Sequence, residues 1–287
     1  MPSLPTFLPR LSLGLLAAFL VSILVRGVLA PTATSTTVLL IVSAVAMFLC
    51  CWASAAHLLG ARAANRFVAI ALPLGWFAEE TGARYGWFFG SYRYTDVLGP
   101  TLGVVPVIIP LMWFALCYVA YILANLMVWQ TPVERTPAPR LYLAHTLVMS
   151  FLAAALVTAY DLGADPYMVF TLKAWIMAKT DGGWFGETLQ GFVGWMVVAF
   201  VIVLLFRLSV RARPPVPALP VLGRHTAVPL GIYAGSMLFQ ACLGTPIETR
   251  AIALFAMGIP LLAALCGWAR WTMPALAAQE AVAGARP

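Results

Sequence analysis

The stretch from Val104 to Val128 reads VVPVIIPLMWFALCYVAYILANLMV and contains no charged residue. A helix needs about 20 mainly apolar residues to cross the hydrocarbon core of a bilayer. This stretch is long enough to do so, and similar apolar runs precede and follow it. The chain is therefore predicted to be an integral membrane protein.

The composition of the whole chain supports the same class. Of the 287 residues, 62% are hydrophobic and only 9% are charged, whereas a soluble domain carries roughly 25% charged residues. Such a chain cannot cover itself with polar surface, so lipid has to solvate part of it. We expect an all-α fold, a polytopic transmembrane helical bundle, as a single integral membrane domain over residues 1–287 without a soluble domain.

About eight membrane spans are expected. The third is the weakest, because Pro73 and Gly75 interrupt it, and if it is re-entrant rather than crossing only seven remain. Pro106 and Pro110 are expected to bend the fourth. The spans are placed near residues 11–29, 38–59, 67–83, 104–128, 142–161, 188–207, 228–243 and 251–269.

The net charge of +7 is better explained by orientation in a membrane than by a nucleic-acid partner. If the N-terminus is cytoplasmic, most Arg and Lys residues fall on the cytoplasmic side, as the positive-inside rule requires. Proline-rich stretches at 131–140 and 213–220 are expected to be solvent loops on that side. Most acids then lie in extracytoplasmic loops rich in Gly, Tyr and Trp. The expected location is the cell membrane, with the run at 11–29 retained rather than cleaved as a signal peptide.

The sequence offers no cofactor or metal motif. The five cysteines all fall inside apolar runs, and none has a C-x-x-C spacing, so free, buried thiols are expected. No nucleotide-binding loop, haem motif or hydrolase motif is present. We therefore expect neither a cofactor nor a bound metal.

The segment Gly75–Pro100, GWFAEETGARYGWFFGSYRYTDVLGP, concentrates acids and aromatic residues beside a span. Glu79 at the end of the third span is a candidate general acid, since partial desolvation favours a protonated carboxyl. The alternative is an ion pair with Arg84 on the same helical face. Tyr92 and Tyr94 alternate, so on an extended backbone both point to one face, and Asp96 follows them.

A second acidic pair, Asp161 and Asp165, has the spacing that places two carboxyls on one helical face. Such pairs can hold Mg²⁺ for a diphosphate substrate, but a second Asp-rich motif is lacking. Pro166 predicts that the helix stops here. Under the eight-span model, the segments 76–100 and 161–187 share one side of the membrane with 244–250 and can meet there.

These residues resemble one known family. Glu79-Glu80-Thr81-Gly82 and the run Phe89–Asp96, followed by Pro106 and Trp113, are similar to the carotenoid-biosynthesis membrane family, which includes the carotenoid 1,2-hydratases. Asp161, Asp165-Pro166 and Phe192-Val193-Gly194-Trp195 resemble its second half in the same order. The resemblance covers about residues 60 to 200.

The resemblance implies a cofactor-independent hydratase that acts on the end of an acyclic carotenoid. Protonation of the terminal alkene gives a tertiary carbocation, which water captures. Glu79 or Asp96 is expected as the acid, and Asp161 or Asp165 as the base that holds the water. The expected substrate-binding residues are Tyr92, Tyr94, Trp113, Trp175 and Trp195.

Two other functions stay open. An end-group cyclase or isomerase begins with the same protonation but loses a proton instead of gaining water. A non-enzymatic transporter or lipid-binding protein also fits broken spans with acids at their edge. The expected partners are a hydrophobic polyene and the lipid bilayer, other carotenoid-biosynthesis enzymes are candidates, and no nucleic acid is expected.

Overall fold

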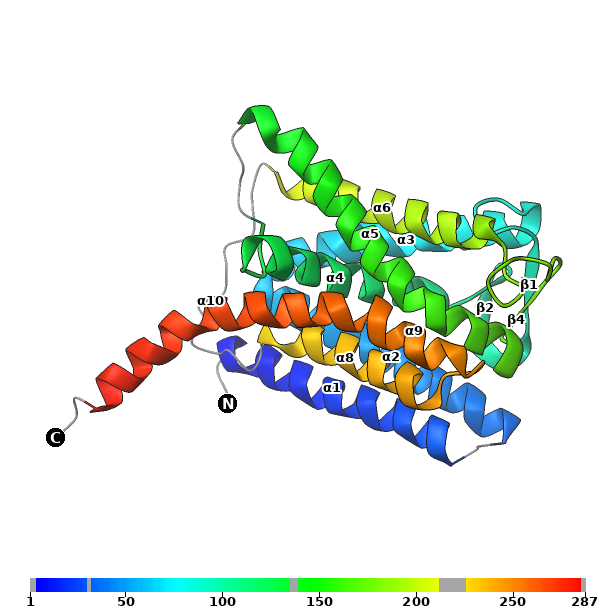
Figure 1. Ribbon diagram of the computed structural model, residues 1–287, viewed down its shortest axis with the longest axis horizontal. Coiled ribbons are helices and arrows are strands. Elements are labelled where there is room, and N and C mark those ends of the chain that lie inside the picture. The colour runs from blue at the N-terminus through cyan, green and yellow to red at the C-terminus, as the bar shows by residue number, and fades with distance from the viewer. Residues whose placement is uncertain (1–3, 30–31, 135–138, 212–225, 285–287) are drawn as a thin grey trace.

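The computed structural model describes residues 4–29, 32–134, 139–211 and 226–284, and most of these residues lie in long helices. The helices lie side by side, and short strands gather at one end of the bundle (Figure 1). The predicted all-α polytopic bundle is confirmed. In chain order the helices are α1 (Leu4–Val28), α2 (Ala33–Leu58), α3 (Ala61–Tyr85), α4 (Ile108–Trp129), α5 (Tyr142–Pro166), α6 (Leu189–Val210), α8 (Val228–Leu243), α9 (Glu248–Ala256) and α10 (Gly258–Gly284).

Within the described residues, six helical segments are long and apolar enough to cross a membrane, so the chain is a multi-pass membrane protein. Helix α8 is apolar but shorter, with 16 residues. The count of eight spans therefore stays a prediction. The six segments are Phe7–Val28, Ala33–Leu58, Ile108–Trp129, Tyr142–Thr171, Leu189–Val210 and Glu248–Met273.

Helix α3 is continuous from Ala61 to Tyr85, with Pro73 inside it. Gly75 does not interrupt the helix either. The packing against α4 leaves no room for a side chain at this position. A Cβ at this position would lie 2.7 Å from the indole of Trp113 on α4. Gly75 therefore lets the two helices approach closely, and whether α3 crosses the membrane stays a prediction.

Helix α4 is the central helix of the bundle, and nearly all of its residues from Trp113 to Leu126 are buried. Its apolar character on every face follows from this position. Phe67 of α3 packs edge-on against Phe114 of α4 with ring centroids 5.7 Å apart, and it stacks on Phe206 of α6 at 4.0 Å. These aromatic contacts join α3, α4 and α6 in the core.

The expected bend of the fourth span is wrong. Pro106 precedes the helix, in a two-stranded hairpin formed by β2 (Thr101–Leu102) and β3 (Val105–Pro106). Pro110 lies in the first turn of α4, where the backbone N–H has no partner within the helix in any case. Neither proline breaks the helical hydrogen bonding. The helix begins at Ile108, four residues later than the expected start at residue 104.

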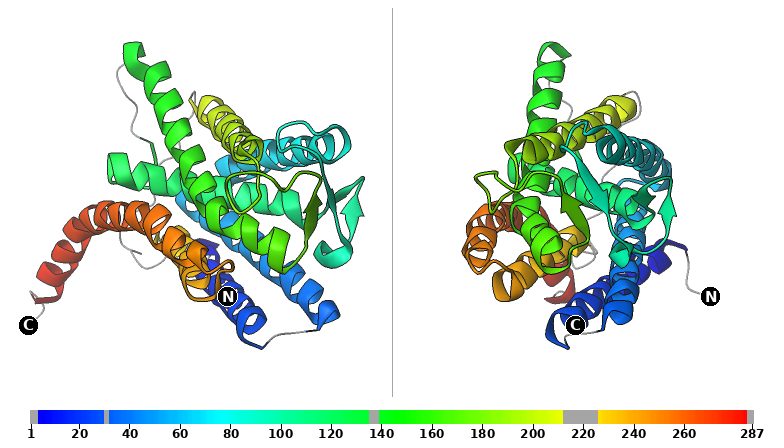
Figure 2. Two further views of the ribbon diagram at one scale, coloured as in Figure 1. Left: turned by 45° about the vertical axis from the view of Figure 1, so that its right-hand side comes forward. Right: turned by 90° about the vertical axis from the view of Figure 1, so that its right-hand side faces the viewer.

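Two loops far apart in the chain join at the end of the bundle. Strand β1 (Tyr92–Tyr94) pairs antiparallel with β4 (Trp175–Met177), and Tyr94 lies opposite Trp175. The pair lies across the helix ends when the bundle is viewed along its length (Figure 2). A short 3₁₀ helix, η1 (Asp96–Leu98), follows β1, and a π-helical turn, η3 (Tyr167–Thr171), links α5 to the loop before β4. The α-helical part of α5 ends at Pro166, but the prediction that the helix stops there is wrong, because η3 continues the helical backbone to Thr171.

Two further expectations need correction. Thr131, Pro132 and Val133 are buried, so the first part of the 131–140 loop is not exposed to solvent as expected. The next described residues form the 3₁₀ turn η2 (Pro139–Leu141). The stretch 213–220 lies outside the described residues. All five cysteines are free, as predicted, but Cys242 and Cys266 are exposed rather than buried.

Candidate active site

A large cavity lies at the end of the bundle that carries the β1–β4 pair. It encloses about 1330 Å³ of empty space, a figure that includes its open mouth. Helices α1 to α6 and α8 all contribute side chains to its wall, most of them apolar. Polar groups are few, and several of them are carboxyls. Such a cavity suits an apolar ligand that reacts with acids.

Glu79 of α3 lies in the wall of this cavity and only 4% of its surface is exposed. Its carboxyl oxygens accept hydrogen bonds from three side chains. The hydroxyls of Tyr92 and Tyr94 donate to Oε2, the latter across 2.6 Å, and the Trp113 indole donates to Oε1 across 2.9 Å. An ionised carboxylate only accepts hydrogen bonds, so three donors fit Glu79 as an anion. The alternative pairing with Arg84 belongs to Glu80 instead, at 2.5 Å.

Strand pairing explains how both tyrosines reach Glu79. On β1 the side chains of Tyr92 and Tyr94 point to the same face, as the alternation predicts. Burial raises the pKa of both phenols well above the usual range, and the nearby charge of Glu79 raises it further. The two hydroxyls therefore keep their protons and act as hydrogen-bond donors to Glu79.

Aromatic rings form a continuous wall next to Glu79. Trp113 and Trp195 have ring centroids 4.7 Å apart. On the other side, Tyr94 packs edge-on against Trp175 with centroids 6.1 Å apart. The negative face of such rings attracts a cation by roughly 0.5–2 kcal/mol each. This wall can therefore stabilise positive charge that develops on an apolar ligand.

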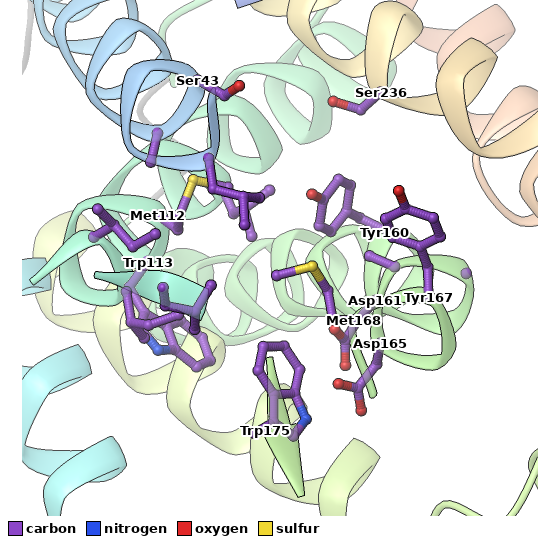
Figure 3. Close-up of a pocket in the computed structure, with 18 of the residues that line it drawn as sticks. Ser43, Met112, Trp113, Tyr160, Asp161, Asp165, Tyr167, Met168, Trp175 and Ser236 are labelled. Atoms are coloured by element: carbon purple, nitrogen blue, oxygen red, sulfur yellow. The ribbon is translucent and has the colours of Figure 1, made fainter. Parts of the chain in front are cut away.

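The second acidic pair faces the same cavity. Asp161 and Asp165 lie one helical turn apart on α5, near Trp175 (Figure 3), with exposed fractions of 2% and 7%. Oδ2 of Asp161 and Oδ1 of Asp165 have no hydrogen-bond partner among the described residues. Trp175 and Glu187 lie next to the Asp165 carboxyl. The two aspartates thus present free carboxyl oxygens inside a cavity.

Glu187 completes the acidic group and was not predicted as a site residue. It lies in the loop before α6, where Gly182 pairs with Gly186 and Trp184 pairs with Glu187. The Trp184 indole fixes this loop on α5 by donating to the Leu162 carbonyl across 3.0 Å. Burial and the neighbouring Asp165 and Asp161 carboxyls raise the pKa of Glu187 to about 12. Glu187 therefore keeps its proton at neutral pH.

The structure brings together most of the residues that the sequence singled out. All of them except Asp96 line the cavity. Asp96 begins η1, is exposed and is absent from the cavity wall. The backbone turns into a 3₁₀ helix after Tyr94, so the alternation that places the two tyrosines does not extend to Asp96. The residues that it gathers are Glu79, Tyr92, Tyr94, Trp113, Asp161, Asp165, Trp175 and Trp195.

Sequence reasoning also missed other polar residues in the cavity wall, among them Arg26, Tyr160 and Gln240. Each lies within a run that reads as an ordinary apolar span. Arg26 packs its guanidinium over the rings of Tyr167 and Phe239, 5.4 and 4.8 Å from their centroids. A polar residue inside a membrane span is the signal that could have drawn attention to them.

No three His, Cys, Asp or Glu side chains among the described residues are arranged to hold a metal ion. What the cavity offers is a carboxylate with three donors on one side and carboxyls with free oxygens on the other. Between them lie aromatic faces. This arrangement can supply a proton, stabilise a cation and accept a proton.

Comparison with known proteins gives the family. The model of a family described as "Carotenoid biosynthesis protein" matches residues 35–265. A bisanhydrobacterioruberin hydratase from Haloarcula japonica is 33% identical over 129 residues, which are 45% of this chain and 39% of that relative. The match thus spans about two fifths of the relative's length. No solved structure matches. With most of its length covered by the family model, the chain belongs to the carotenoid biosynthesis protein family.

Proposed function

We propose that this protein hydrates the terminal 1,2 double bond of an acyclic carotenoid without a cofactor. The observation that carries the proposal is the cavity itself, where Glu79, Asp161 and Asp165 lie buried beside an aromatic wall, with Glu187 buried next to Asp165. The name of the Haloarcula japonica relative and the family assignment support the same chemistry. The distribution of Arg and acids supports a place in the cell membrane, with a cytoplasmic N-terminus and this site on the extracytoplasmic side.

The first step is protonation of the alkene. A proton adds to the CH carbon of the terminal double bond, and a tertiary cation forms on the carbon that carries the two methyl groups. Asp165 is the best proton donor, because the proton that it shares with the neighbouring Glu187 passes onto Asp165 and reaches the alkene through the free Asp165 oxygen in the cavity. Buried carboxyls that lie together cannot all ionise, so this pair retains a proton.

Glu79 then takes a different role from the one expected from the sequence. Its three donors favour the anion, which suits a group that stabilises the cation rather than one that supplies a proton. Tyr92, Tyr94 and Trp113 hold the carboxylate in place before the charge appears. Preorganised charge of this kind is usually the largest contribution to catalysis.

Water completes the reaction on the side of α5. Asp161 has a free carboxyl oxygen that accepts a hydrogen from the water. When the water oxygen bonds to the cationic carbon, Asp161 takes the released proton. The proton then passes back to Asp165, one helical turn away, and the site returns to its first state. The net change is the addition of one water to the alkene.

Pigment analysis tests this function. The protein is produced in a host that accumulates lycopene or an elongated acyclic carotenoid. The pigments are separated, and mass spectrometry measures the molecular mass of each. Hydration adds the mass of one water per reacted end. A new pigment of unchanged mass supports a cyclase or isomerase instead. Proton-coupled flux in liposomes without pigment conversion supports a transporter.

A further inference from the structure

Leu162 of α5 has a backbone carbonyl that its own helix does not satisfy in the usual way. In an α-helix each N–H donates to the carbonyl four residues earlier. The residue four positions after Leu162 is Pro166, which has no N–H to donate. The indole of Trp184 supplies a donor instead, because its Nε1 donates to this carbonyl across 3.0 Å. This anchor point lies between Asp161 and Asp165 in the chain, on the turn that carries both acids.

Trp184 joins this anchor to Glu187. Its ring packs edge-on against Phe185 and against Phe192 of α6, with centroids 5.2 and 6.2 Å away. Its backbone carbonyl accepts a hydrogen bond from the N–H of Glu187 across 2.9 Å. The residue that docks on α5 is therefore bonded directly to the residue that lies next to Asp165.

A tight turn fixes the path of the chain from Trp184 to Glu187. Gly182 and Gly186 exchange two backbone hydrogen bonds of 3.1 Å each. A Cβ on Gly182 would collide with the backbone of Glu187, whereas a Cβ on Gly183 would meet nothing within 4 Å. The turn therefore has no room for a side chain at 182, and this close packing helps to set the position of Glu187.

Glu187 is only 3% exposed, and the titratable groups that act on it are Asp165 and Asp161 of α5. Glu79 of α3 acts in turn on Asp161. Carboxyls at such short distance cannot all ionise, so they retain a proton while they remain together. The other charged side chains of β1 and of the loops from 171 to 188 are exposed to solvent, namely Arg93, Lys173, Lys179 and Asp181.

We propose that Trp184 is a positioning residue of the site. By docking on the carbonyl that Pro166 leaves without a helical donor, it holds Glu187 beside Asp165 and so keeps on this pair the proton that the reaction uses. This inference rests on the proposed function. Trp184 is absent from the cavity wall, so it acts through the two carboxyls and not on the substrate. Without the indole N–H, Glu187 is no longer held against α5, and the proton leaves the site at lower pH.

The test uses Trp184→Phe, which keeps an aromatic ring but removes the indole N–H. Membranes that contain the full chain are supplied with an acyclic carotenoid in detergent over a range of pH, and mass spectrometry measures the hydrated pigment. We expect the alkaline limit of hydration to move to lower pH by about one pH unit, the scale of one hydrogen bond expressed as a pKa difference. Trp76→Phe is the matched control, because the Trp76 indole also donates to a backbone carbonyl across 3.0 Å, that of Leu102, away from the cavity wall. Its alkaline limit should stay in place.

Two further comparisons separate positioning from general damage to the fold. Glu187→Gln already removes the group that shares the proton, so adding Trp184→Phe to it should move the alkaline limit no further. Gly182→Ala displaces the backbone of Glu187 and is expected to move the limit in the same direction as Trp184→Phe. Gly183→Ala, whose added carbon meets open space, is expected to leave the limit unchanged.

A profile of Trp184→Phe that superimposes on that of the wild type overturns the proposal, and so does one that is lowered equally at every pH. A second, additive shift in the double variant also overturns it. If Trp184→Phe does not accumulate in membranes, the two glycine variants decide by the same criterion. A wild type that forms no hydrated pigment at any pH overturns the proposed function instead.

Discussion

The hydroxyl of Tyr94 on β1 donates a hydrogen bond to Oε2 of Glu79 on α3 across 2.6 Å. This contact joins a loop strand to a long helix at the wall of the cavity. Because β1 is paired with β4, the same strand also positions Trp175. The position of Glu79 thus depends on segments far apart in the sequence, and its chemistry follows from the donors that they supply.

Glu79→Gln is expected to reduce activity at least about 100-fold, the scale of losing a preorganised charge at a reacting centre. The new amide would also direct its own donors at Tyr92, Tyr94 or Trp113. Pigment yield per amount of membrane protein measures the effect. Glu80→Gln is the matched control, since Glu80 pairs with Arg84 and does not line the cavity, and it should retain most of the activity. Equal activity in both variants would contradict the role of Glu79.

Asp161→Asn is expected to lower hydration more than Tyr94→Phe does. The first change removes the base that takes the proton from water, and a placed acid or base contributes roughly 10²–10⁴-fold. The second removes one of three donors to Glu79, which is expected to cost about tenfold or less. Both variants are assayed in a host that makes lycopene. If Asp161→Asn forms as much hydrated pigment as the wild type, Asp161 is not the base.

Glu187→Gln is expected to move the alkaline limit of activity to lower pH. Glu187 has its pKa raised from roughly 4.3 in an unfolded chain to about 12. A raised pKa keeps the proton on the folded protein as the pH rises, so activity that needs this proton is present at neutral pH and lost only under strongly alkaline conditions. Without the second carboxyl, Asp165 loses the neighbouring group with which it shares its proton.

The corresponding measurement is a pH–rate profile of membranes that contain the wild type or Glu187→Gln. The comparison concerns the alkaline limb, where the proton shared by Glu187 and Asp165 is lost. Profiles that superimpose at high pH would show that Glu187 does not share the proton used in the reaction.

Local patterns predicted the parts of the site that depend on a single element. The alternation of Tyr92 and Tyr94 predicts one face because a strand repeats every two residues. The spacing of Asp161 and Asp165 predicts one helical face for a similar reason. Both patterns hold in the structure, since all four side chains line the cavity.

Contacts between distant segments were beyond this kind of reasoning. Nothing near Glu187 in the sequence indicates that its loop folds back onto Leu162 through Trp184. Gln240 likewise lies in an apolar run, and its partner is a backbone carbonyl of another helix. The prediction that Asp96 belongs to the site is wrong for the opposite reason, because it extended a local pattern past the end of the strand.

Asp96→Asn is therefore expected to leave hydration within about twofold of the wild type, since surface changes away from a site usually have small effects. The side chain is exposed and does not contribute to the cavity wall. The same lycopene-making host provides the assay, with Asp165→Asn as an inactive reference of the same residue type. A large loss in Asp96→Asn would place it back among the catalytic acids.

The other end of the bundle allows a prediction on stability rather than on chemistry. The guanidinium of Arg207 on α6 is fully buried and lies 3.0 Å from the Glu134 carboxylate. It also donates to Asn125 across 3.0 Å and lies over the ring of Tyr121, 4.4 Å from its centroid. These contacts hold the start of the loop after α4 against α6.

Removing one partner of a buried ion pair leaves an uncompensated charge and costs about 3–5 kcal/mol. Glu134→Gln is thus expected to lower the temperature at which the detergent-solubilised protein unfolds, while the product it makes stays the same. Replacing both Glu134 and Arg207 by Met removes the buried charge altogether, and such replacements are often neutral or stabilising. The double variant should therefore unfold at a higher temperature than Glu134→Gln alone. If the double variant is the less stable of the two, the pair stabilises the bundle by its attraction, and the cost of burying its charges is the smaller effect.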